Sequence, residues 1–476
     1  MAGGFIGEYE QQDIITTADI RGVLKEFFGG DLHHFVDGFI GNYSGISRCL
    51  LLSMMFFGLL GVLSRQIPNL PLFAFEWLLG TSPIWIPILM LVTAWKVWVW
   101  YSRGMFFFHK VKPILYEVKM PRDIFRSPRA MENALSTWWS DAGETTPLNR
   151  VWQGQVRPWH SLEIASFGGE IHFYIWGWRN WKQSIEAAMY AFYPEVELVE
   201  VEDYASKFKF DPKVHEIYAT DWRLEPRNDA YPFKTYVDFE LDKDPKEEYR
   251  VDPLAPVLER MSNLEPFEQM WLQIVITMNK DQRRKKGGSW MESEGRYQGM
   301  LKETVEEIRK ETTAIDPHNG PDKWKTYARV QLFRYNELIK AIDRNMGKHP
   351  FSVGVRGTYI TNAATFSSAR WTGHKWIWRP FGNPQFANQL RPRRWHTPFD
   401  YPWQDYKDIR WNLHARRFFD AYKRRSFFYS PWIFPHNMMS SEMVATLWHP
   451  PSAAVTAPGL ERIAAKKAEP PSNLPK

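Results

Sequence analysis

Arginine, lysine and tryptophan are concentrated in one stretch of the sequence, from Arg370 to Arg425. The stretch holds 13 Lys and Arg residues against four acids, and this local balance of +9 exceeds the +6 of the whole chain. Six tryptophans are interleaved with these cations. Because Arg and Lys neutralise phosphates while aromatic rings stack on bases, the pattern is typical of a surface that binds single-stranded nucleic acid. The candidate binding residues are Arg391, Arg393, Arg394, Trp395, Arg416, Arg417, Lys423, Arg424 and Arg425.

The same stretch has a second interpretation, which the sequence leaves open. Cations also gather on protein surfaces that lie under the anionic cytoplasmic leaflet of a membrane. In that case the tryptophans would belong mainly to the protein core, and the arginines would face lipid headgroups.

Patterns that carry a reaction are missing from the chain. There is no phosphate-binding loop of the form G-x-x-x-x-G-K-[ST], no glycine-rich dinucleotide fingerprint after a strand, and no H-E-x-x-H pair. The 13 histidines are scattered, and the single cysteine, Cys49, excludes both a disulfide framework and a Cys-based zinc site. His172 is expected to be an ordinary strand residue, and His449 is expected to cap a turn. We therefore expect a protein that is not an enzyme, with no cofactor, metal or catalytic residue.

Two apolar runs, Ile46–Leu63 and Ile84–Tyr101, predict that the chain is attached to a membrane. Each has about the ~20 residues that a helix needs to cross a bilayer. Trp98, Trp100 and Tyr101 are typical of an interfacial aromatic belt. The sequence therefore predicts a two-helix transmembrane hairpin within residues 46–104, and a pair of buried core helices is the alternative.

Charges on either side of the second run predict the orientation of this hairpin. Seven Lys and Arg residues follow the run between Arg103 and Arg129, whereas the connection between the runs carries one, Arg65. An excess of Lys and Arg marks the cytoplasmic side. Both termini should therefore be cytoplasmic. The region before the hairpin, residues 1–45, has the spacing of an amphipathic segment that lies on the membrane or packs on the body.

The chain after the hairpin predicts an α+β fold. In residues 105–230, apolar patterns give the order strand, helix, strand, strand, helix, strand, over Val111–Val118, Pro128–Trp139, Leu162–Phe167, Glu170–Trp176, Trp181–Phe192 and Val196–Val201. Gly168 and Gly169 indicate a two-residue hairpin turn. Ile171, Phe173 and Ile175 should share the buried face of their strand. Within these elements, the order strand, strand, helix, strand is most of a ferredoxin-like sandwich.

A similar order predicts a second α+β domain over residues 231–435. The expected elements are a strand at Phe233–Leu241, a helix from Asp252 to Leu264, strands at Glu268–Met278 and Phe351–Ile360, and a helix at Ala363–Trp371. Residues 279–347 interrupt it as an insertion with two charged helices, expected to form a projecting hairpin that is either a solvated excursion or a partner-binding arm. Residues 436–476 are expected to form an extended C-terminal tail.

Several segments of this chain resemble one bacterial family. They are Ser161–Ile164, Gly169–Tyr174, Ala191–Pro194, Val199–Tyr204, Lys234–Tyr236, Asp252–Leu254, Glu268–Ile274, Ala445–Pro451 and Ala465–Pro475. Together they are similar to the uncharacterised membrane-anchored N-terminal region of type IV secretion or conjugation ATPases of the coupling-protein kind. In the longer relatives the closing segment runs into the ATPase domain, whereas this chain ends at Lys476.

The resemblance implies the anchor and adaptor half of a transfer machine without its motor. A cytoplasmic ATPase would then be supplied in trans and would dock on the tail, while the tandem domains would form a collar, and we expect a homo-oligomer. The expected location is the bacterial inner membrane, with several crossings and the folded domains in the cytoplasm. The family has no established catalytic residues, so none is implied here. A membrane-tethered protein that binds single-stranded DNA on its own is the alternative.

Overall fold

The computed structural model describes residues 54–56, 58–59, 61, 69–107, 109, 112–122, 124, 126–139, 148–212, 214–242, 252–279, 296–312, 333–362, 365–383, 388–396, 405, 407–429, 434–453 and 455–463. The chain divides into two compact units. The first comprises Met1–Ser102 with Asp400–Gln404, and the second comprises Arg103–Phe399 with Asp405–Lys476. Each unit is described by itself below.

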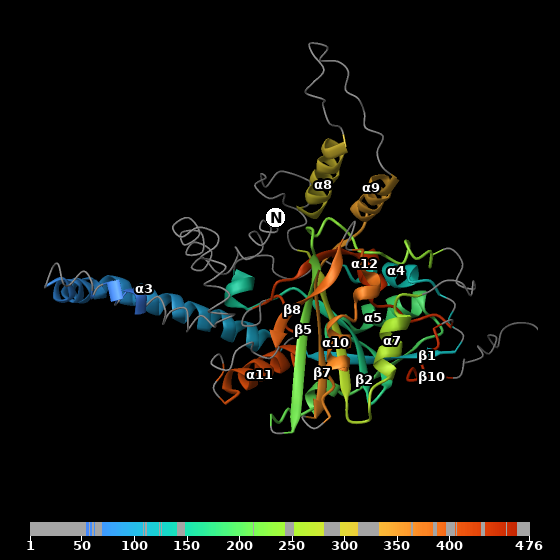
Figure 1. Cartoon of the computed structure of the whole chain (residues 1–476), viewed down its shortest axis with the longest axis horizontal. Helices are drawn as coiled ribbons and strands as arrows, with labels where there is room; N and C mark the ends of the chain where they lie inside the picture. The colour runs from blue at the N-terminus through green and yellow to red at the C-terminus, as the bar shows by residue number, and fades with distance from the viewer. Residues whose placement is uncertain are drawn as a thin grey trace, which may run out of the picture. The chain divides into compact units, whose positions relative to one another are not determined.

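One long apolar helix, α3 (Leu70–Phe106), dominates the described part of the first unit (Figure 1). Its segment Phe75–Phe106 is long and apolar enough to cross a membrane, and none of the apolar window within it is buried. Pro83 and Pro87 lie inside this helix, and the hydroxyl of Ser82 donates to the carbonyl oxygen of Leu79 (2.6 Å), the group that Pro83 deprives of its usual helical donor. By length and composition alone, α3 is thus a candidate membrane span.

The described structure differs from the predicted two-helix hairpin. Residues from Leu70 to Pro83, which the sequence analysis assigned to the connection, are helical and continuous with the second apolar run. Most of the first run lies outside the described residues, as does all of the segment 1–45. The described part of the chain shows one candidate span and not a hairpin of two spans.

The second unit is an α+β body built on one large sheet, so the predicted class is confirmed. Its strands are β1 (Pro113–Pro121), β2 (Trp159–Phe167), β3 (Glu170–Trp178), β4 (Glu197–Glu200), β5 (His215–Glu225), β6 (Gln269–Met278), β7 (Pro350–Asn362), β8 (Gln389–His396), β9 (Asn437–Ser440) and β10 (Arg462–Ile463). The main path is β10-β1-β3-β2-β6-β7-β5-β8, while β4 also pairs with β1 and β9 with β7. All pairings within this sheet are antiparallel except that of β10 with β1.

The two halves of the sheet repeat one arrangement of strands. The first half has the spatial order β4-β1-β3-β2, and the second has β8-β5-β7-β6. In each half the first strand therefore pairs with the third and the fourth, and the second strand lies at the inner edge. The halves meet where β2 pairs with β6, for example at Glu163 opposite Gln273. Residues that the sequence assigned to two domains thus form one continuous sheet.

Helices cover the sheet on both faces. The larger core lies under α4 (Arg129–Trp138), α5 (Lys182–Phe192), α7 (Ala255–Ser262), α10 (Ser368–Lys375) and α12 (Ser441–Leu447). Ile171, Phe173 and Ile175 all point into it, as the period of two predicts. The opposite face carries a second core under α6 (Tyr204–Lys207) and α11 (Ile409–Lys423). Shorter turns are η3 (Leu148–Trp152), η4 (Arg179–Trp181) and η6 (Arg379–Phe381).

Two features follow directly from the sequence. Gly168 and Gly169 form the turn between β2 and β3 with positive φ angles of 59° and 95°, a conformation that favours glycine. The insertion forms a helical arm of α8 (Arg296–Thr312) and α9 (Phe333–Met346), which lie side by side (Figure 1). Its apolar residues pack on each other and on Ala230 and Met438 of the body.

Three predictions about the second half were wrong or incomplete. Phe233–Leu241 is not a strand: Thr235 donates its backbone N–H to Asp238 Oδ2 (2.9 Å), which closes a turn. The first strand of this half is instead β5, which the sequence analysis left unassigned together with β8. The expected tail also begins later than residue 436, because β9 joins the sheet and every residue of α12 is buried.

Candidate functional site

A row of polar side chains crosses the face of the sheet that lies under α11. Neighbouring strands place these residues opposite one another in register, from β1 at one side to β8 at the other: Glu117, Tyr174, Glu163, Gln273, Arg356, Asp221 and Arg393. Period-two alternation puts polar residues on this face of seven strands at the same height. The centre and the β8 end of the row differ in their surroundings.

At the centre, the row is closed by a buried hydrogen-bond network. Arg356 Nε donates to Gln273 Oε1 (2.6 Å), and Gln273 Nε2 donates to Glu163 Oε1 (2.8 Å). The guanidinium of Arg356 also donates to the carbonyl oxygens of Ala421 (2.8 Å) and Ser426 (3.0 Å), and so fixes the end of α11. Burial lowers the pKa of Arg356 to about 9, which still leaves it charged at neutral pH.

Arg425 completes this network from the opposite side of Glu163. Its Nε lies 2.9 Å from Glu163 Oε1, and its Nη1 lies 2.6 Å from Asp203 Oδ2. Arg425 and Glu163 both have fully buried side chains. The expectation that Arg425 belongs to a nucleic-acid-binding surface is therefore corrected, because its guanidinium is enclosed and already holds two carboxylates.

At the β8 end, the row opens onto a group of arginines. Arg391 and Arg393 of β8 lie opposite Arg223 and Asp221 of β5, so all four side chains are on the same face of the sheet. Burial raises the pKa of Asp221 to about 6, against the opposing effect of Arg393. Burial, and then the neighbouring Arg393, lowers the pKa of Arg223. We call Asp221, Arg223, Arg391 and Arg393 the β8-edge arginine site.

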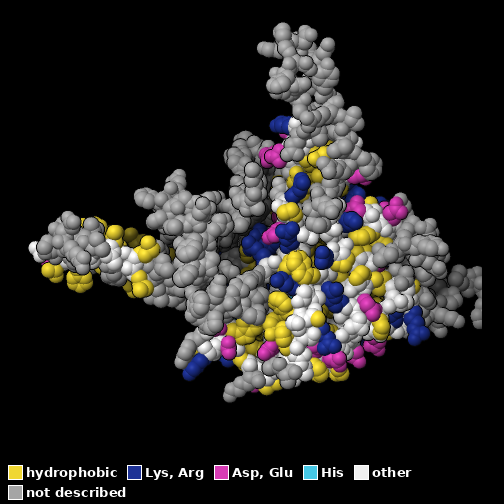
Figure 2. All heavy atoms as spheres, viewed as in Figure 1, with side chains coloured by type: hydrophobic (Ala, Val, Ile, Leu, Met, Phe, Trp, Pro, Cys, Tyr) yellow, Lys and Arg dark blue, Asp and Glu magenta, His cyan; other side chains and the backbone are white. Residues whose placement is uncertain are grey.

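Three carboxyls lie near the arginines of this site: Asp221 within it, and Asp229 and Glu225, which favour the charged form of Arg223. Asp221 has its Oδ1 atom buried without a hydrogen-bond partner in the part of the chain that the structure describes. Arg391 and Arg393 are half-buried on the edge strand of the sheet. Several Lys and Arg side chains gather on the face of the molecule that shows β5 and β8 (Figure 2). The guanidinium groups of Arg391 and Arg393, half-buried at the edge, can bind an anion such as a phosphate.

The remaining predicted residues have different positions. Arg416 and Arg417 are exposed on α11. Lys423 lies over the ring of Phe419, 4.7 Å from its centroid, and Arg424 Nε lies 2.9 Å from Asp420 Oδ1. Arg394 and Trp395 are in β8, but their side chains are outside the described part of the structure. Of the predicted binding residues, the structure thus places Arg391 and Arg393 in one site, and Arg223, which was not predicted, belongs to the same site.

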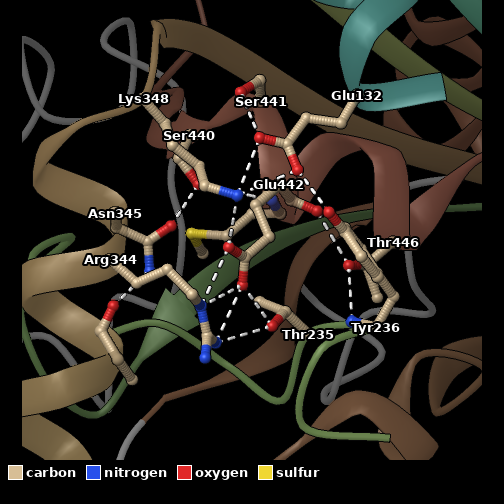
Figure 3. Close-up of polar contacts among 12 residues, drawn as sticks. Glu132, Thr235, Tyr236, Arg344, Asn345, Lys348, Ser440, Ser441, Glu442 and Thr446 are labelled. Atoms are coloured by element: carbon tan, nitrogen blue, oxygen red, sulfur yellow. Dashed lines mark hydrogen bonds and ion pairs between the residues drawn. The ribbon is translucent and has the colours of Figure 1, made fainter. Parts of the chain in front are cut away.

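A second polar cluster lies where the helical arm joins the body (Figure 3). Glu442 of α12 is completely buried, and it accepts hydrogen bonds from Arg344 Nε at 2.9 and 3.0 Å. Lys348 Nζ lies 2.7 Å from Glu442 Oε2 and 2.7 Å from Glu132 Oε1. Arg344 also reaches Asp238 Oδ1 at 3.0 Å. Every charge in this cluster has a partner, so it acts as a clamp between the arm, α4 and α12.

Three of the described histidines are enclosed in the body. His160 and His374 are enclosed in the core, and burial lowers their pKa values to about 4 and about 3, so both are neutral at pH 7. His449 is buried between Ala445 and Asp252, with Nε2 3.1 Å from Asp252 Oδ2. Among the described residues, no group of three or more His, Cys, Asp and Glu side chains is arranged to hold a metal ion.

Comparison with known proteins adds no family to this description: no protein-family model and no curated protein matches the chain. The residues that sequence reasoning missed are Asp221 and Arg223. Their signal was the alternation in His215–Glu225, where Ile217, Ala219, Asp221 and Arg223 recur at every second position. Assigning that segment as a strand would have placed both residues on one face.

Proposed function

We propose that this protein is a non-enzymatic, membrane-anchored component of a transfer machine of the type IV secretion or conjugation kind. It would serve as the adaptor between the membrane and a cytoplasmic ATPase supplied in trans. The observation that carries the proposal is α3, whose apolar side chains stay exposed along its length. In water such a surface would be costly, at ~25 cal/mol for each Å² of apolar area.

The end of α3 supports the idea of a fixed adaptor. Phe107 stacks on Trp159 with 5.8 Å between ring centroids, and Phe106 meets Trp178 edge-on at 6.2 Å. Arg103 lies 5.5 Å from the ring centroid of Tyr429. The last turn of α3 is thus packed into the core of the body, and an anchored helix would hold the body at the membrane.

The finer architecture belongs to the same proposal. We propose that each half of the sheet is a ferredoxin-like sandwich, with the order β4-β1-β3-β2 in one half and β8-β5-β7-β6 in the other. We also propose that the apolar run 46–63 is a second span. The protein would then be a multi-pass inner-membrane protein with its folded body in the cytoplasm.

Reporter fusions test the proposed topology. Reporters at the N-terminus and at the C-terminus should both report the cytoplasm, and one inserted at residue 66, between the two apolar runs, should report the other side. Opposite sides for the two termini would show that α3 is the single span. A cytoplasmic signal from all three sites, with the protein released from membranes by carbonate, would refute the membrane anchor.

Co-purification tests the adaptor role. Full-length protein extracted in mild detergent should retain an ATPase, and a variant truncated after Ile463 should lose it because the resemblance assigns docking to the tail. The matched control is Lys340→Ala, which removes a surface charge 2.9 Å from Glu337 on the arm and should retain the ATPase. Failure of the intact protein to retain any ATPase would refute the adaptor role.

A membrane-tethered protein that binds single-stranded nucleic acid is the second candidate function. The specific observation that favours it is the β8-edge arginine site, in which Arg223, Arg391 and Arg393 lie on one face. Arginine is well suited to phosphate groups because its planar fork can donate two parallel hydrogen bonds. The salt dependence of binding, described in the Discussion, tests this function.

A further inference from the structure

The outward face of α11 combines exposed apolar residues with arginines. At 100° per residue, positions 409, 413, 416, 417, 420 and 424 fall on one side of the helix. Ile409 and Leu413 are 53% and 59% exposed, and Arg416 and Arg417 are exposed beside them. The opposite side of α11 buries Phe418, Phe419 and Tyr422 in the core. A helix that packs through one face needs no large apolar side chains on the other.

The buried face of α11 shares its core with Phe106, the last residue of α3, and with Phe107, which follows it. Phe106 and Phe107 pack in the same cluster as Phe418 and Phe419, and Arg103 contacts Tyr429 just beyond α11. The helix that would cross the membrane therefore joins the body on the face of the sheet that α11 covers.

Exposed aromatic residues occur directly before this junction. Trp95, Trp98, Trp100 and Tyr101 of α3 are 52%, 37%, 56% and 56% exposed, respectively. Trp and Tyr favour the headgroup level of a bilayer. Because α3 continues without a break to Phe106, such a belt would end within about one turn of the residues packed into the body.

We propose that the outward face of α11 docks on the anionic headgroups of the bilayer that α3 crosses. Ile409 and Leu413 would enter the boundary between headgroups and acyl chains, and Arg416 with Arg417 would pair with lipid phosphates. This inference rests on the membrane anchor of the proposed function and adds a second contact to it. The body would then be held at the membrane in one orientation.

Lipid suits this face better than nucleic acid does. Binding of single strands draws on aromatic side chains for base stacking. The outward face of α11 has no aromatic residue: its members are Ile409, Leu413, Arg416, Arg417, Asp420 and Arg424. Two exposed aliphatic side chains gain little from phosphates but gain free energy when they leave water.

The test places a fluorescent label on α11 of the full-length protein. In a Cys49→Ser background, Leu413→Cys is labelled with an environment-sensitive dye and the protein is reconstituted into vesicles. One set of vesicles is phosphatidylcholine, and the other contains 30% phosphatidylglycerol. The matched control is Tyr190→Cys, because Tyr190 is 44% exposed on α5, which packs on the opposite face of the sheet.

With anionic vesicles, the dye at position 413 should shift to the blue, resist quenching by aqueous iodide and be quenched by lipids with brominated chains. The dye at position 190 should show none of these changes. Adding Arg416→Ala should lower the ratio of shielded to exposed label about fivefold, given the usual contribution of one cation near an anionic surface. Arg126→Ala, which breaks a surface pair with Glu195 before α4, should not change it.

Each other outcome would overturn the proposal. Equal iodide quenching at positions 413 and 190 would show that α11 stays in water. A response to single-stranded DNA but not to anionic lipid would assign the face to nucleic acid. Protein that does not float with the vesicles at all would refute the anchor itself, and so would be distinguished from failure of the α11 contact.

Discussion

The two halves of the sheet share their strand order but differ in the charge of their outer edges. In the first half, Glu200 of β4 is paired with Arg179 at 2.7 Å and with Lys182 at 3.4 Å. Near the same edge, Glu117 of β1 lies 2.7 Å from His172. In the second half, Arg391 of β8 lies opposite Arg223 and Arg393 lies opposite Asp221, with Asp229 and Glu225 also near Arg223.

The second half also carries the helical arm, whereas residues 168–169 suffice to connect β2 and β3 in the first half. An edge whose charges are paired within the chain needs no partner. An edge that presents half-buried arginines, as β8 does with Arg391 and Arg393, is available to an anion. Under the proposed function, the first half would be mainly scaffold, and contacts with other molecules would belong to the second half.

Substitutions where β2 pairs with β6, at the junction of the two halves, should destabilise the body most. Arg425→Ala removes the cation that holds Glu163 of β2, and it leaves that buried carboxylate without its main partner. Loss of one partner of a buried pair typically costs about 3–5 kcal/mol. We expect a loss of this size in the free energy of unfolding of the detergent-solubilised protein, measured by chemical denaturation.

Arg424→Ala is the matched control for this change. Arg424 is the adjacent arginine, it is exposed, and its contact with Asp420 is a surface pair between residues four apart on α11. Such pairs contribute about 0.3–0.5 kcal/mol. Equal effects of the two substitutions would contradict the assignment of Arg425 to the core.

Asp221 should give the second half a pH dependence that the variant Asp221→Asn lacks. Burial raises the pKa of Asp221 to about 6 in the folded protein, above its ordinary value of 3.8. Below pH 4, Asp221 is protonated in both the folded and the unfolded state, so its raised pKa makes its full contribution to the free energy of unfolding. As the pH rises through 6 the folded state loses this advantage, on the order of 3 kcal/mol for about two pKa units.

Comparing the native protein with Asp221→Asn isolates the contribution of Asp221 to the pH dependence of stability. The unfolding free energy of the native protein, measured from pH 4 to pH 7.5, should fall relative to that of Asp221→Asn. Parallel curves for the two proteins over this window would show that Asp221 is solvated, and that the β8-edge arginine site is more open than its burial indicates.

Removing Glu442 should weaken the attachment of the helical arm to the body. Glu442→Ala leaves Arg344 and Lys348 without their shared buried partner, although Asp238 and Glu132 remain as counter-charges. Because Arg344 and Lys348 are partly exposed, we expect about 2 kcal/mol, below the usual cost of breaking a fully buried pair. Hydrogen exchange should accelerate in α9. Glu337→Ala, which removes the surface pair with Lys340, should leave exchange unchanged in the rest of α9.

The sequence was most informative where one residue pattern had one physical cause. The alternation of apolar residues predicted β2 and β3 and the buried face of β3, and the Gly168–Gly169 pair predicted the turn between them. Helical spacing gave α4, α5, α7 and the two helices of the arm. These features depend on contacts that are local in the chain, so a short window of sequence contains the information that determines them.

The candidate site could not be predicted to the same extent, because it depends on contacts between distant residues. Arg425 lies in the most basic part of the sequence, next to Arg424, and only the approach of Glu163 and Asp203 distinguishes the two arginines. Arg223 meets Arg391 across 168 positions of sequence through strand pairing. Residue type alone cannot separate an arginine that holds the core together from one that faces solvent.

The smallest expected effect concerns the arginines of the β8 edge, Arg391 and Arg393. If this edge binds single-stranded DNA, the double substitution Arg391→Ala and Arg393→Ala removes up to two phosphate contacts. The slope of log affinity against log salt should then flatten by up to about 1.4, at ~0.7 per contact. Fluorescence anisotropy of a labelled oligonucleotide with the detergent-solubilised full chain would measure this slope between 50 and 200 mM salt.

The first half supplies the control that makes this slope informative. Arg179→Ala also removes an arginine, but one that Glu200 already neutralises at 2.7 Å. An arginine paired within the chain releases few counterions when DNA binds, so this variant should keep the native slope. If Arg179→Ala flattens the slope as much as one of the β8 substitutions does, the binding is spread over the whole surface and the two edges do not differ. If the native protein shows no binding at 50 mM salt, nucleic acid is not the anion, and the β8-edge arginines would belong to the contact with the ATPase or the membrane.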